Sequence, residues 1–343
     1  MLYFIHGSFA FPKSNEREMH AVFGAYTILA KSINLYIIRA RNIDLKSAKN
    51  TMFIYRILKL QWHGPIDESD YLGSIKTVLE SSKITKKRMK IECVDVLSRR
   101  DHSAKDIEVY LGENLEKKGA NIDIKTPEVL YYIILFKMNC YIGSMPYSKL
   151  RFVDPGRHYK ELSLGISRAE FKIMQAFDEF NITPKNGTAL DLGAAPGGWS
   201  AHLARKGMKV IAVDKGLLDY DRFTSLGISM CIIEDMQINE DVNGFDVINI
   251  KSLFDDVLLG KIKFSMITCD MNVSPEETSK AIIKFSKSIK KGGAVIATIK
   301  CTTRNVGNYV KIAKDALEKE FTINRVKVLP SNRQEATLFA VKK

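Results

Sequence analysis

A nine-residue stretch, Asp191-Leu-Gly-Ala-Ala-Pro-Gly-Gly-Trp199, constrains the fold of this chain more than any other feature. It follows a short apolar run, Gly187–Leu190, that is typical of a buried parallel strand. Ser200–Lys206 comes next and has the pattern of a helix. Because a glycine-rich turn between a strand and a helix marks the first turn of a doubly wound sheet, the sequence predicts an α/β fold organised around this turn.

The same turn indicates which kind of ligand it can hold. Gly193, Gly197 and Gly198 lack a Cβ, so the backbone there can approach a ligand closely. The spacing is not the G-x-G-x-x-G of a pyrophosphate-binding turn, and Pro196 removes an N–H that a phosphate would need. Asp214 ends the next predicted strand, where a carboxylate usually binds ribose hydroxyls. We therefore expect a nucleoside ligand without a pyrophosphate, such as S-adenosylmethionine.

Five separate stretches of the chain together resemble one enzyme family. Asp191–Trp199 is similar to the cofactor loop of FtsJ-like RNA ribose 2′-O-methyltransferases. Four more stretches match that family's motifs, and the resemblance covers roughly residues 165–343; they are Ser167–Lys172, Thr268–Asn272, Ala297–Lys300 and Asn332–Ala336. In one departure, Met271 is followed by Asn-Val where the family more often has Ala-Pro, which would reshape the wall on the substrate side.

The resemblance implies a catalytic tetrad and a cofactor site. The tetrad would consist of Lys172, Asp270, Lys300 and Glu335, each within one of the matching stretches. Asp235, after the third predicted strand, would hold the adenine amino group, with its neighbour Glu234 as the alternative. The residues expected to bind S-adenosylmethionine are Asp191, Gly193, Ala194, Ala195, Pro196, Gly197, Gly198, Trp199, Asp214, Asp235 and Asp270.

The sequence leaves two roles open for Lys300. A ribose hydroxyl is a weak nucleophile, so an enzyme of this family must orient it and manage its proton. Burial favours a neutral lysine, whereas the flanking carboxylates Asp270 and Glu335 favour the ammonium form. We expect Lys300 either to remove the proton or to orient the hydroxyl oxygen, with Lys172 steadying the substrate.

The apolar runs of the C-terminal half predict a Rossmann-like, seven-stranded methyltransferase sheet that is mostly parallel. Five strands alternate with helices, and two more form a closing hairpin. Because parallel strands end at the same edge of a sheet, we expect the loops after the first and fourth strands to lie side by side. The strands are predicted at 188–192, 209–214, 228–233, 264–270, 294–300, 324–329 and 336–341.

The N-terminal half predicts α+β structure, and its first 82 residues contain no catalytic constellation. The order of elements after residue 83 resembles a THUMP domain, an RNA-binding module, with strands at 89–96, 121–125 and 129–137 and a helix at 103–118. We therefore predict an N-terminal α+β domain (1–82), a THUMP-like RNA-binding domain (83–145), a linker (146–165) and an FtsJ-like methyltransferase domain (166–343).

The charge of the chain favours a polyanionic partner. Lys and Arg outnumber Asp and Glu by 52 to 39, which gives a net charge of +13. No run of 18 apolar residues could cross a membrane, so we expect structured RNA, ribosomal or transfer, as the partner, and no membrane. A basic cluster can also be an ordinary solvated face. The residues expected to contact RNA phosphates are Lys86, Lys87, Arg88, Arg99, Arg100, Arg157 and Lys160.

Cysteine and histidine usage predicts neither disulfides nor a metal site. The five cysteines are scattered without C-x-x-C spacing, and the six histidines are dispersed. The first residues lack the basic region of a secretory signal. We expect a cytoplasmic, metal-free monomer with reduced thiols.

Three functions stay open. The first is S-adenosylmethionine-dependent 2′-O-ribose methylation of RNA. The three-part layout is similar to that of enzymes that act on large-subunit ribosomal RNA, with transfer RNA as the alternative because THUMP domains mostly serve tRNA enzymes. The second is a catalytically inactive THUMP RNA-binding or assembly factor, against which the complete tetrad argues. The third is base methylation, whose usual Asn/Asp-Pro-Pro-aromatic motif is absent from Cys269-Asp-Met-Asn-Val.

Overall fold

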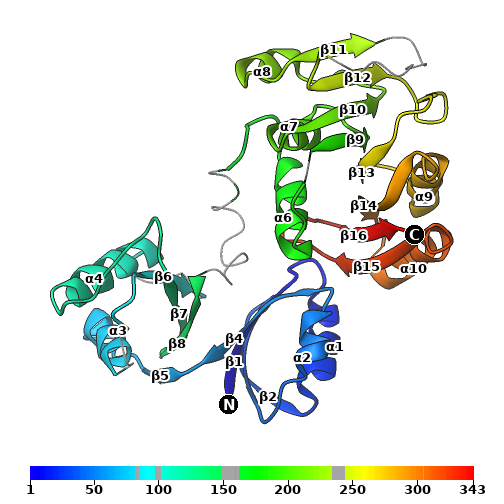
Figure 1. Ribbon diagram of the computed structural model, residues 1–343. Helices are drawn as coiled ribbons and strands as arrows, with labels where there is room; N and C mark the ends of the chain where they lie inside the picture. The colour runs from blue at the N-terminus through cyan, green and yellow to red at the C-terminus, as the bar shows by residue number, and fades with distance from the viewer. Residues whose placement is uncertain are drawn as a thin grey trace. The chain divides into compact units, whose positions relative to one another are not determined.

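The computed structural model describes residues 1–81, 85–96, 102–147, 159, 162–184, 186–233, 244–303 and 305–343. The chain divides into two compact units, Met1–Val153 and Asp154–Lys343, whose helices and strands are labelled in Figure 1. Each unit has buried hydrophobic clusters of its own.

The first unit begins with an antiparallel sheet of four strands in the order β2-β3-β1-β4. Ile5, Met19 and Tyr36 are fully buried between this sheet and its first helix. Pro12 begins that helix, a position where its missing N–H is not needed. The elements are β1 (Leu2–Gly7), α1 (Pro12–Phe23), β2 (Tyr26–Lys31), β3 (Leu35–Ala40), α2 (Leu45–Lys49) and β4 (Ile54–Leu60).

A second sheet of four strands, in the order β5-β8-β7-β6, completes this unit. β6 and β7 are parallel, and the other neighbours are antiparallel. Its strand β5 and the helix α3 come from before residue 83, so the sheet begins upstream of the predicted domain boundary. The domain boundaries stay predictions. The elements are β5 (Trp62–Pro65), α3 (Tyr71–Glu80), β6 (Met89–Asp95), α4 (Ala104–Glu116), β7 (Val129–Phe136) and β8 (Asn139–Pro146).

The prediction of a strand at 121–125 was wrong. Of these residues, Ile122 forms an isolated bridge with Met89. Asp123 accepts hydrogen bonds from the backbone N–H of Lys125 at 2.8 Å and of Thr126 at 2.9 Å. Such local side-chain bonds offer the backbone an alternative to a strand ladder, so the segment forms a turn.

The second unit is built on one mixed sheet with the strand order β11-β12-β10-β9-β13-β14-β16-β15. The strands from β11 to β14 are parallel, and β16 runs antiparallel to both of its neighbours. The predicted Rossmann-like, mostly parallel sheet with a closing antiparallel hairpin is confirmed. The strands are β9 (Gly187–Leu192), β10 (Met208–Asp214), β11 (Met230–Ile233), β12 (Val247–Lys251), β13 (Phe264–Cys269), β14 (Ile289–Lys300), β15 (Phe321–Lys327) and β16 (Glu335–Lys342).

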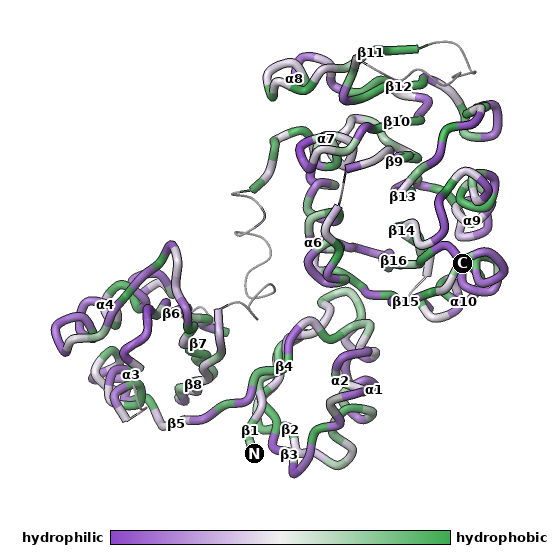
Figure 2. Tube along the Cα trace, viewed as in Figure 1, coloured by the Kyte–Doolittle hydropathy of each residue, from purple (hydrophilic) through white to green (hydrophobic). Residues whose placement is uncertain are grey.

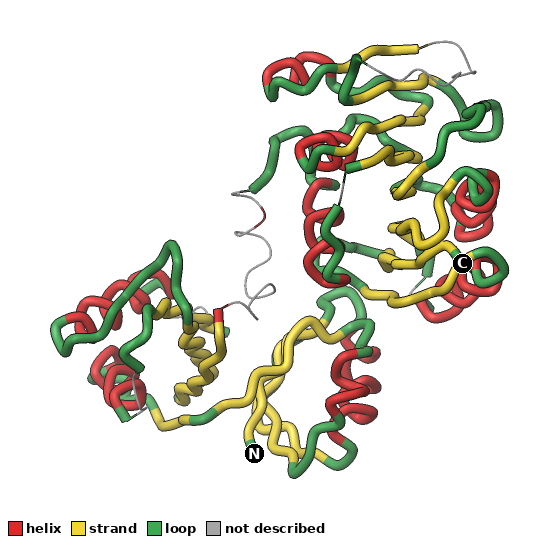
Figure 3. Tube along the Cα trace, viewed as in Figure 1, coloured by secondary structure: helices red, strands yellow, loops and turns green. Residues whose placement is uncertain are grey.

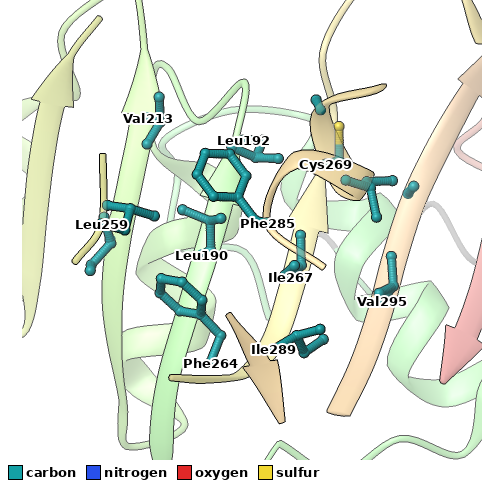
Figure 4. Close-up of a cluster of buried hydrophobic side chains, with 14 of the residues drawn as sticks. Leu190, Leu192, Val213, Leu259, Phe264, Ile267, Cys269, Phe285, Ile289 and Val295 are labelled. Atoms are coloured by element: carbon teal, nitrogen blue, oxygen red, sulfur yellow. The ribbon is translucent and has the colours of Figure 1, made fainter. Parts of the chain in front are cut away.

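Helices cover both faces of this sheet (Figure 3). The hydropathy along the chain alternates in these helices, as expected when one side of a helix packs and the other faces water (Figure 2). One face buries Leu190, Phe264 and Phe285 in a single cluster (Figure 4). The helices are α6 (Glu170–Phe180), α7 (Gly198–Arg205), α8 (Tyr220–Ser225), α9 (Pro275–Lys284) and α10 (Val306–Leu317).

Strand β12 is the main difference from the predicted sheet. It pairs with β10 on one side and with β11 on the other, so the described sheet has eight strands rather than seven. The segment at 228–233, which was predicted as the third strand, contains β11 and is therefore separated from β10 by β12. The short apolar run Val247-Ile-Asn-Ile250 carries the signal that would have identified β12.

Shortening a side chain on β12 is expected to destabilise the protein far more than shortening one on β11. Ile250 is fully buried, whereas Ile232 on β11 is 42% exposed. We expect Ile250→Ala to lower the free energy of unfolding by about 2–5 kcal/mol. Ile232→Ala, the matched control, should change it by no more than about 0.5 kcal/mol. Urea unfolding of both variants checks this, and equal losses would contradict an inner position for β12.

Candidate active site at the carboxyl edge of the sheet

The glycine-rich turn lies against the segment that follows β13. Gly193 has φ +74°, and a Cβ there would stand 2.8 Å from the backbone nitrogen of Met271. The backbone N–H of Asp270 also donates to the carbonyl of Leu192 at 3.0 Å. The loops after β9 and β13 therefore lie side by side, and glycine is required where they meet.

Asp191 lies beneath the turn rather than on its surface. It is 1% exposed, and its two oxygens accept hydrogen bonds from the hydroxyls of Ser200 at 2.6 Å and Thr268 at 2.8 Å. Burial raises the pKa of Asp191 to about 7, and the two hydroxyl donors offset this only in part. Asp191 thus ties α7 and β13 to β9, while its predicted contact with a cofactor stays a prediction.

Asp214 stands at the end of β10, beside the turn. Its carboxylate accepts hydrogen bonds from the backbone N–H of Ala195 at 3.1 Å and of Gly216 at 2.8 Å. Each oxygen keeps a further acceptor site for a ligand hydroxyl. The end of β12 lies next to it, because the N–H of Ser252 donates to the carbonyl of Asp214 at 3.0 Å.

The remaining residues of the turn differ in how deeply they are buried. Ala194 is buried, Ala195 is half-buried and Pro196 is exposed. Gly197 has φ +113° and precedes α7. Trp199 is 3% exposed, and its indole N–H donates to the carbonyl of Ala169 at 2.8 Å, so it packs into the core.

A buried carboxylate, which we call the Glu170 clasp, joins the turn to helix α6. Glu170 accepts hydrogen bonds from the N–H of Leu164 and Ile166, both at 2.6 Å, and of Ser167 at 2.8 Å. His202 on α7 lies 3.1 Å away. A Cβ on Gly198 would come within 2.9 Å of the Glu170 side chain, so the two helices touch here. The sequence predicted no role for Glu170, because its contact with His202, which is 32 residues away along the chain, is visible only in the structure.

The four predicted tetrad residues form a closed cycle of ion pairs, which we call the charge ring. Lys172 lies 3.1 Å from Asp270 and 2.8 Å from Glu335. Lys300 lies 2.8 Å from Asp270 and 2.5 Å from Glu335. Lys300 and Glu335 are register partners on β14 and β16, while Asp270 follows β13 and Lys172 lies on α6. The four side chains are between 8% and 19% exposed, so each is mostly buried and retains some access to solvent.

The charge ring holds Lys300 as an ammonium and Glu335 as a carboxylate. Burial alone would lower the pKa of Lys300, but the carboxylates of Asp270 and Glu335 outweigh it and raise that pKa. Burial alone would raise the pKa of Glu335, but Lys172 and Lys300 outweigh it and lower that pKa. In this state Lys300 is a hydrogen-bond donor and not a base.

The other predicted site residues lie elsewhere or outside the described residues. Asp235, Arg99, Arg100, Arg157 and Lys160 are outside them. In the first unit, Lys86 and Lys87 are exposed. Arg88 is exposed as well, but it pairs with Glu128 at 3.4 Å and Asp123 at 3.6 Å, so part of its charge is compensated.

Neither a metal cluster nor a membrane-spanning helix is found in the described part of the chain. No group of three or more His, Cys, Asp or Glu side chains there could hold a metal ion. No described helix is both long and apolar enough to span a bilayer.

Comparison with known proteins finds that the second unit is similar to one family. A sequence model of FtsJ-like methyltransferases matches residues 166–329. "Ribosomal RNA large subunit methyltransferase M" of Shewanella denitrificans is 30% identical over 186 residues, 46% of each chain. An uncharacterized protein of Methanocaldococcus jannaschii is 28% identical over 159 residues, 46% of this chain and 38% of its own. This chain thus spans less than half the length of either relative.

One solved structure matches over the full length of both chains. TrmN from Thermus thermophilus covers 100% of each chain at 12% identity, with a TM-score of 0.42.

Replacing Asp191 by asparagine should remove a pH dependence of stability. Because the folded pKa of about 7 lies above the unfolded value, the folded state keeps a proton that the unfolded state releases between about pH 4 and 7. Wild-type stability should therefore fall as pH rises through this window, by about 4 kcal/mol in total.

Urea unfolding from pH 4.5 to 8 measures this effect, and the Asp191→Asn variant should lack the slope. Asp246→Asn is the control, because a hydrogen bond from Ser229 lowers the pKa of that carboxyl, so its titration lies below the window. Equal slopes in wild type and Asp191→Asn would contradict the prediction.

Proposed function

We propose, from the premise that residues 166–329 form an FtsJ-like methyltransferase domain, that this chain transfers a methyl group from S-adenosylmethionine to a ribose 2′-hydroxyl of RNA. The observation that carries the proposal is the charge ring beside the glycine-rich turn. A ribose hydroxyl must be oriented and must lose its proton as it attacks. Two ammonium and two carboxylate groups in contact offer donors for the oxygen and acceptors for the proton.

The turn and Asp214 fit a nucleoside cofactor. When bound, S-adenosylmethionine would supply an activated methyl group on a sulfonium centre. Asp214 would accept hydrogen bonds from ribose hydroxyls, and Gly193 and Gly197 would let the cofactor approach the backbone. Pro196 offers no N–H, which fits a ligand without phosphate. For the adenine, the end of β12 at Ser252 lies next to Asp214 and offers hydrogen-bonding groups. Asp235, which lies outside the described residues, stays the partner predicted from the sequence.

Lys300 would act first as a donor. It gives hydrogen bonds to Asp270 and Glu335, which leaves one of its three N–H groups for the attacking oxygen. As the hydroxyl proton leaves, Lys300 can take it while passing one of its own to Asp270 or Glu335, so that the ammonium is restored. Lys172, which contacts the same two carboxylates, would hold them in place and steady the substrate.

The charge distribution supports RNA as the substrate, with large-subunit ribosomal RNA as the proposed class. Residues 251–343, which supply three of the four ring residues, contain 18 Lys and Arg against nine Asp and Glu, an excess that favours a polyanionic substrate. Lys86, Lys87 and Arg88 add exposed cations in the first unit. The relative named for large-subunit ribosomal RNA supports that class, and transfer RNA remains the alternative.

The proposal predicts a 2′-O-methylated product that depends on Lys300. Labelled methyl groups should pass from S-adenosylmethionine to RNA from cells that lack this gene, and nucleoside analysis should find them on ribose. In Lys300→Ala we expect the single-turnover rate to fall roughly a hundredfold or more, as for a lost proton-transfer group.

Lys290→Ala is the matched control, since this exposed lysine lies at the other end of the same strand. A methylated base as product would contradict the proposed reaction. A folded Lys300→Ala protein that works at the wild-type rate would exclude Lys300 from the chemistry. A purely structural ion pair predicts instead a loss of about 3–5 kcal/mol in stability, with slowing only through unfolding.

Asp214→Asn should weaken cofactor binding. The variant loses the charge that strengthens hydrogen bonds to ribose hydroxyls, so calorimetry with S-adenosylmethionine should show a dissociation constant raised about ten- to a hundredfold. Asp246→Asn is the control, because Asp246 precedes β12 at the opposite edge of the sheet. Unchanged affinity in Asp214→Asn would place the cofactor elsewhere.

A further inference from the structure

Two uncharged side chains contact the charge ring from outside, one at each carboxylate. Thr298 is fully buried on β14, two residues before Lys300 and on the same face of the strand. Its hydroxyl donates to Oδ1 of Asp270 at 2.6 Å. This is the same oxygen that accepts the hydrogen bond from Lys300.

Asn332 holds the other carboxylate through its amide. The side-chain NH2 of Asn332, which is 7% exposed, donates to Oε1 of Glu335 at 3.1 Å. Its amide oxygen accepts hydrogen bonds from the N–H of Leu329 at 2.7 Å and from the hydroxyl of Thr337 at 3.1 Å. The oxygen of Asn332 thus fixes the turn before β16, while its nitrogen reaches the ring.

The neutral donors Thr298 and Asn332 constrain the orientation of the carboxylates in a way that the lysines do not. An ammonium group is a compact charge with three rotatable donors, so a lysine–carboxylate pair tolerates several orientations. Hydroxyl and amide hydrogen bonds are directional, and here they come from buried groups on the strand and the turn. The hydrogen bonds from Thr298 and Asn332 therefore restrict the planes of Asp270 and Glu335 more than the ion pairs with the lysines do.

We propose that Thr298 and Asn332 are positioning residues that orient the carboxylates of the charge ring, and through them Lys300, toward the attacking ribose oxygen. The proposal rests on the function proposed above. A displacement of about 1 Å in a reacting group can slow an enzyme roughly a hundredfold, so these two contacts should matter for the rate.

The first test compares two variants of Thr298. Thr298→Val has nearly the same shape and suits a strand, but lacks the hydroxyl. Thr298→Ser keeps the hydroxyl. In single-turnover methyl transfer at saturating cofactor and RNA, we expect Thr298→Val to be roughly ten- to a hundredfold slower, with unchanged cofactor affinity, and Thr298→Ser to stay within about threefold of wild type.

The second test separates the two ends of Asn332. Asn332→Asp keeps an oxygen for Leu329 and Thr337 but places a titratable group beside Glu335, with Lys172, Lys300 and Asp270 as the other charged neighbours. At pH 8 the introduced carboxylate would repel Glu335, and transfer should be slow. As the pH is lowered, the introduced carboxyl would gain a proton, which the neighbouring Glu335 favours, and could then donate a hydrogen bond, so the deficit relative to wild type should shrink. Asn308→Asp, the same substitution at an exposed position of α10, is the control and should work at the wild-type rate at pH 8 and at the lower pH.

The outcomes separate this proposal from the proposed function. Wild-type rates in both Thr298→Val and Asn332→Asp at pH 8, or an Asn332→Asp deficit independent of pH, would overturn the positioning role. If the wild-type protein transfers no methyl group to RNA, the proposed function fails. The positioning role is then decided by NMR of the lysine ammonium groups. A slowly exchanging Lys300 signal should be present in wild type and Thr298→Ser and lost in Thr298→Val, and its survival in Thr298→Val would overturn the proposal.

Discussion

The ion pairs among Lys172, Asp270, Lys300 and Glu335 are the interaction on which the rest of the second unit depends. Each of these charges is mostly buried, and a buried charge is costly unless a partner of opposite sign lies beside it. The partners come from a helix, two parallel strands and an antiparallel strand that are far apart in the sequence. The order β13-β14-β16 brings them together, because the end of β14 lies between the end of β13 and the start of β16.

The two sides of the carboxyl edge differ in their chemistry. Toward β10 and β12 the edge offers backbone N–H groups, glycines and the single carboxylate of Asp214, which suits a neutral sugar. Toward β14 and β16 it offers paired charges. Asp191, with both oxygens held by Ser200 and Thr268, lies between the two sides and keeps the strands that carry them in register. This division fits the proposed reaction, in which a sulfonium donor meets a sugar hydroxyl.

Motifs that are local in sequence could be predicted, and features that depend on neighbours in space could not. The strand-turn-helix around Asp191–Trp199 and the four ring residues each lie within a recognisable stretch, so the fold and the ring followed from the sequence. β12 was missed because its short apolar run gives a weak signal. Residues 121–125 form a turn because the Asp123 side chain accepts hydrogen bonds from the backbone N–H groups of Lys125 and Thr126. In the sequence nothing distinguishes Thr298 from other threonines in strands, and its hydrogen bond to Asp270 is visible only in the structure.

The Glu170 clasp has a consequence for the order of events at this site. The carboxylate joins the segment before α6 to His202 on α7, while Trp199 reaches back to Ala169. The turn and the helix that bears Lys172 therefore form one mechanical unit. A ligand that ordered the turn would therefore order the start of α6 as well, and a second ligand at Lys172 would meet a helix that had already lost part of its freedom. Because such coupling is reciprocal, each ligand would then strengthen the binding of the other by the same factor.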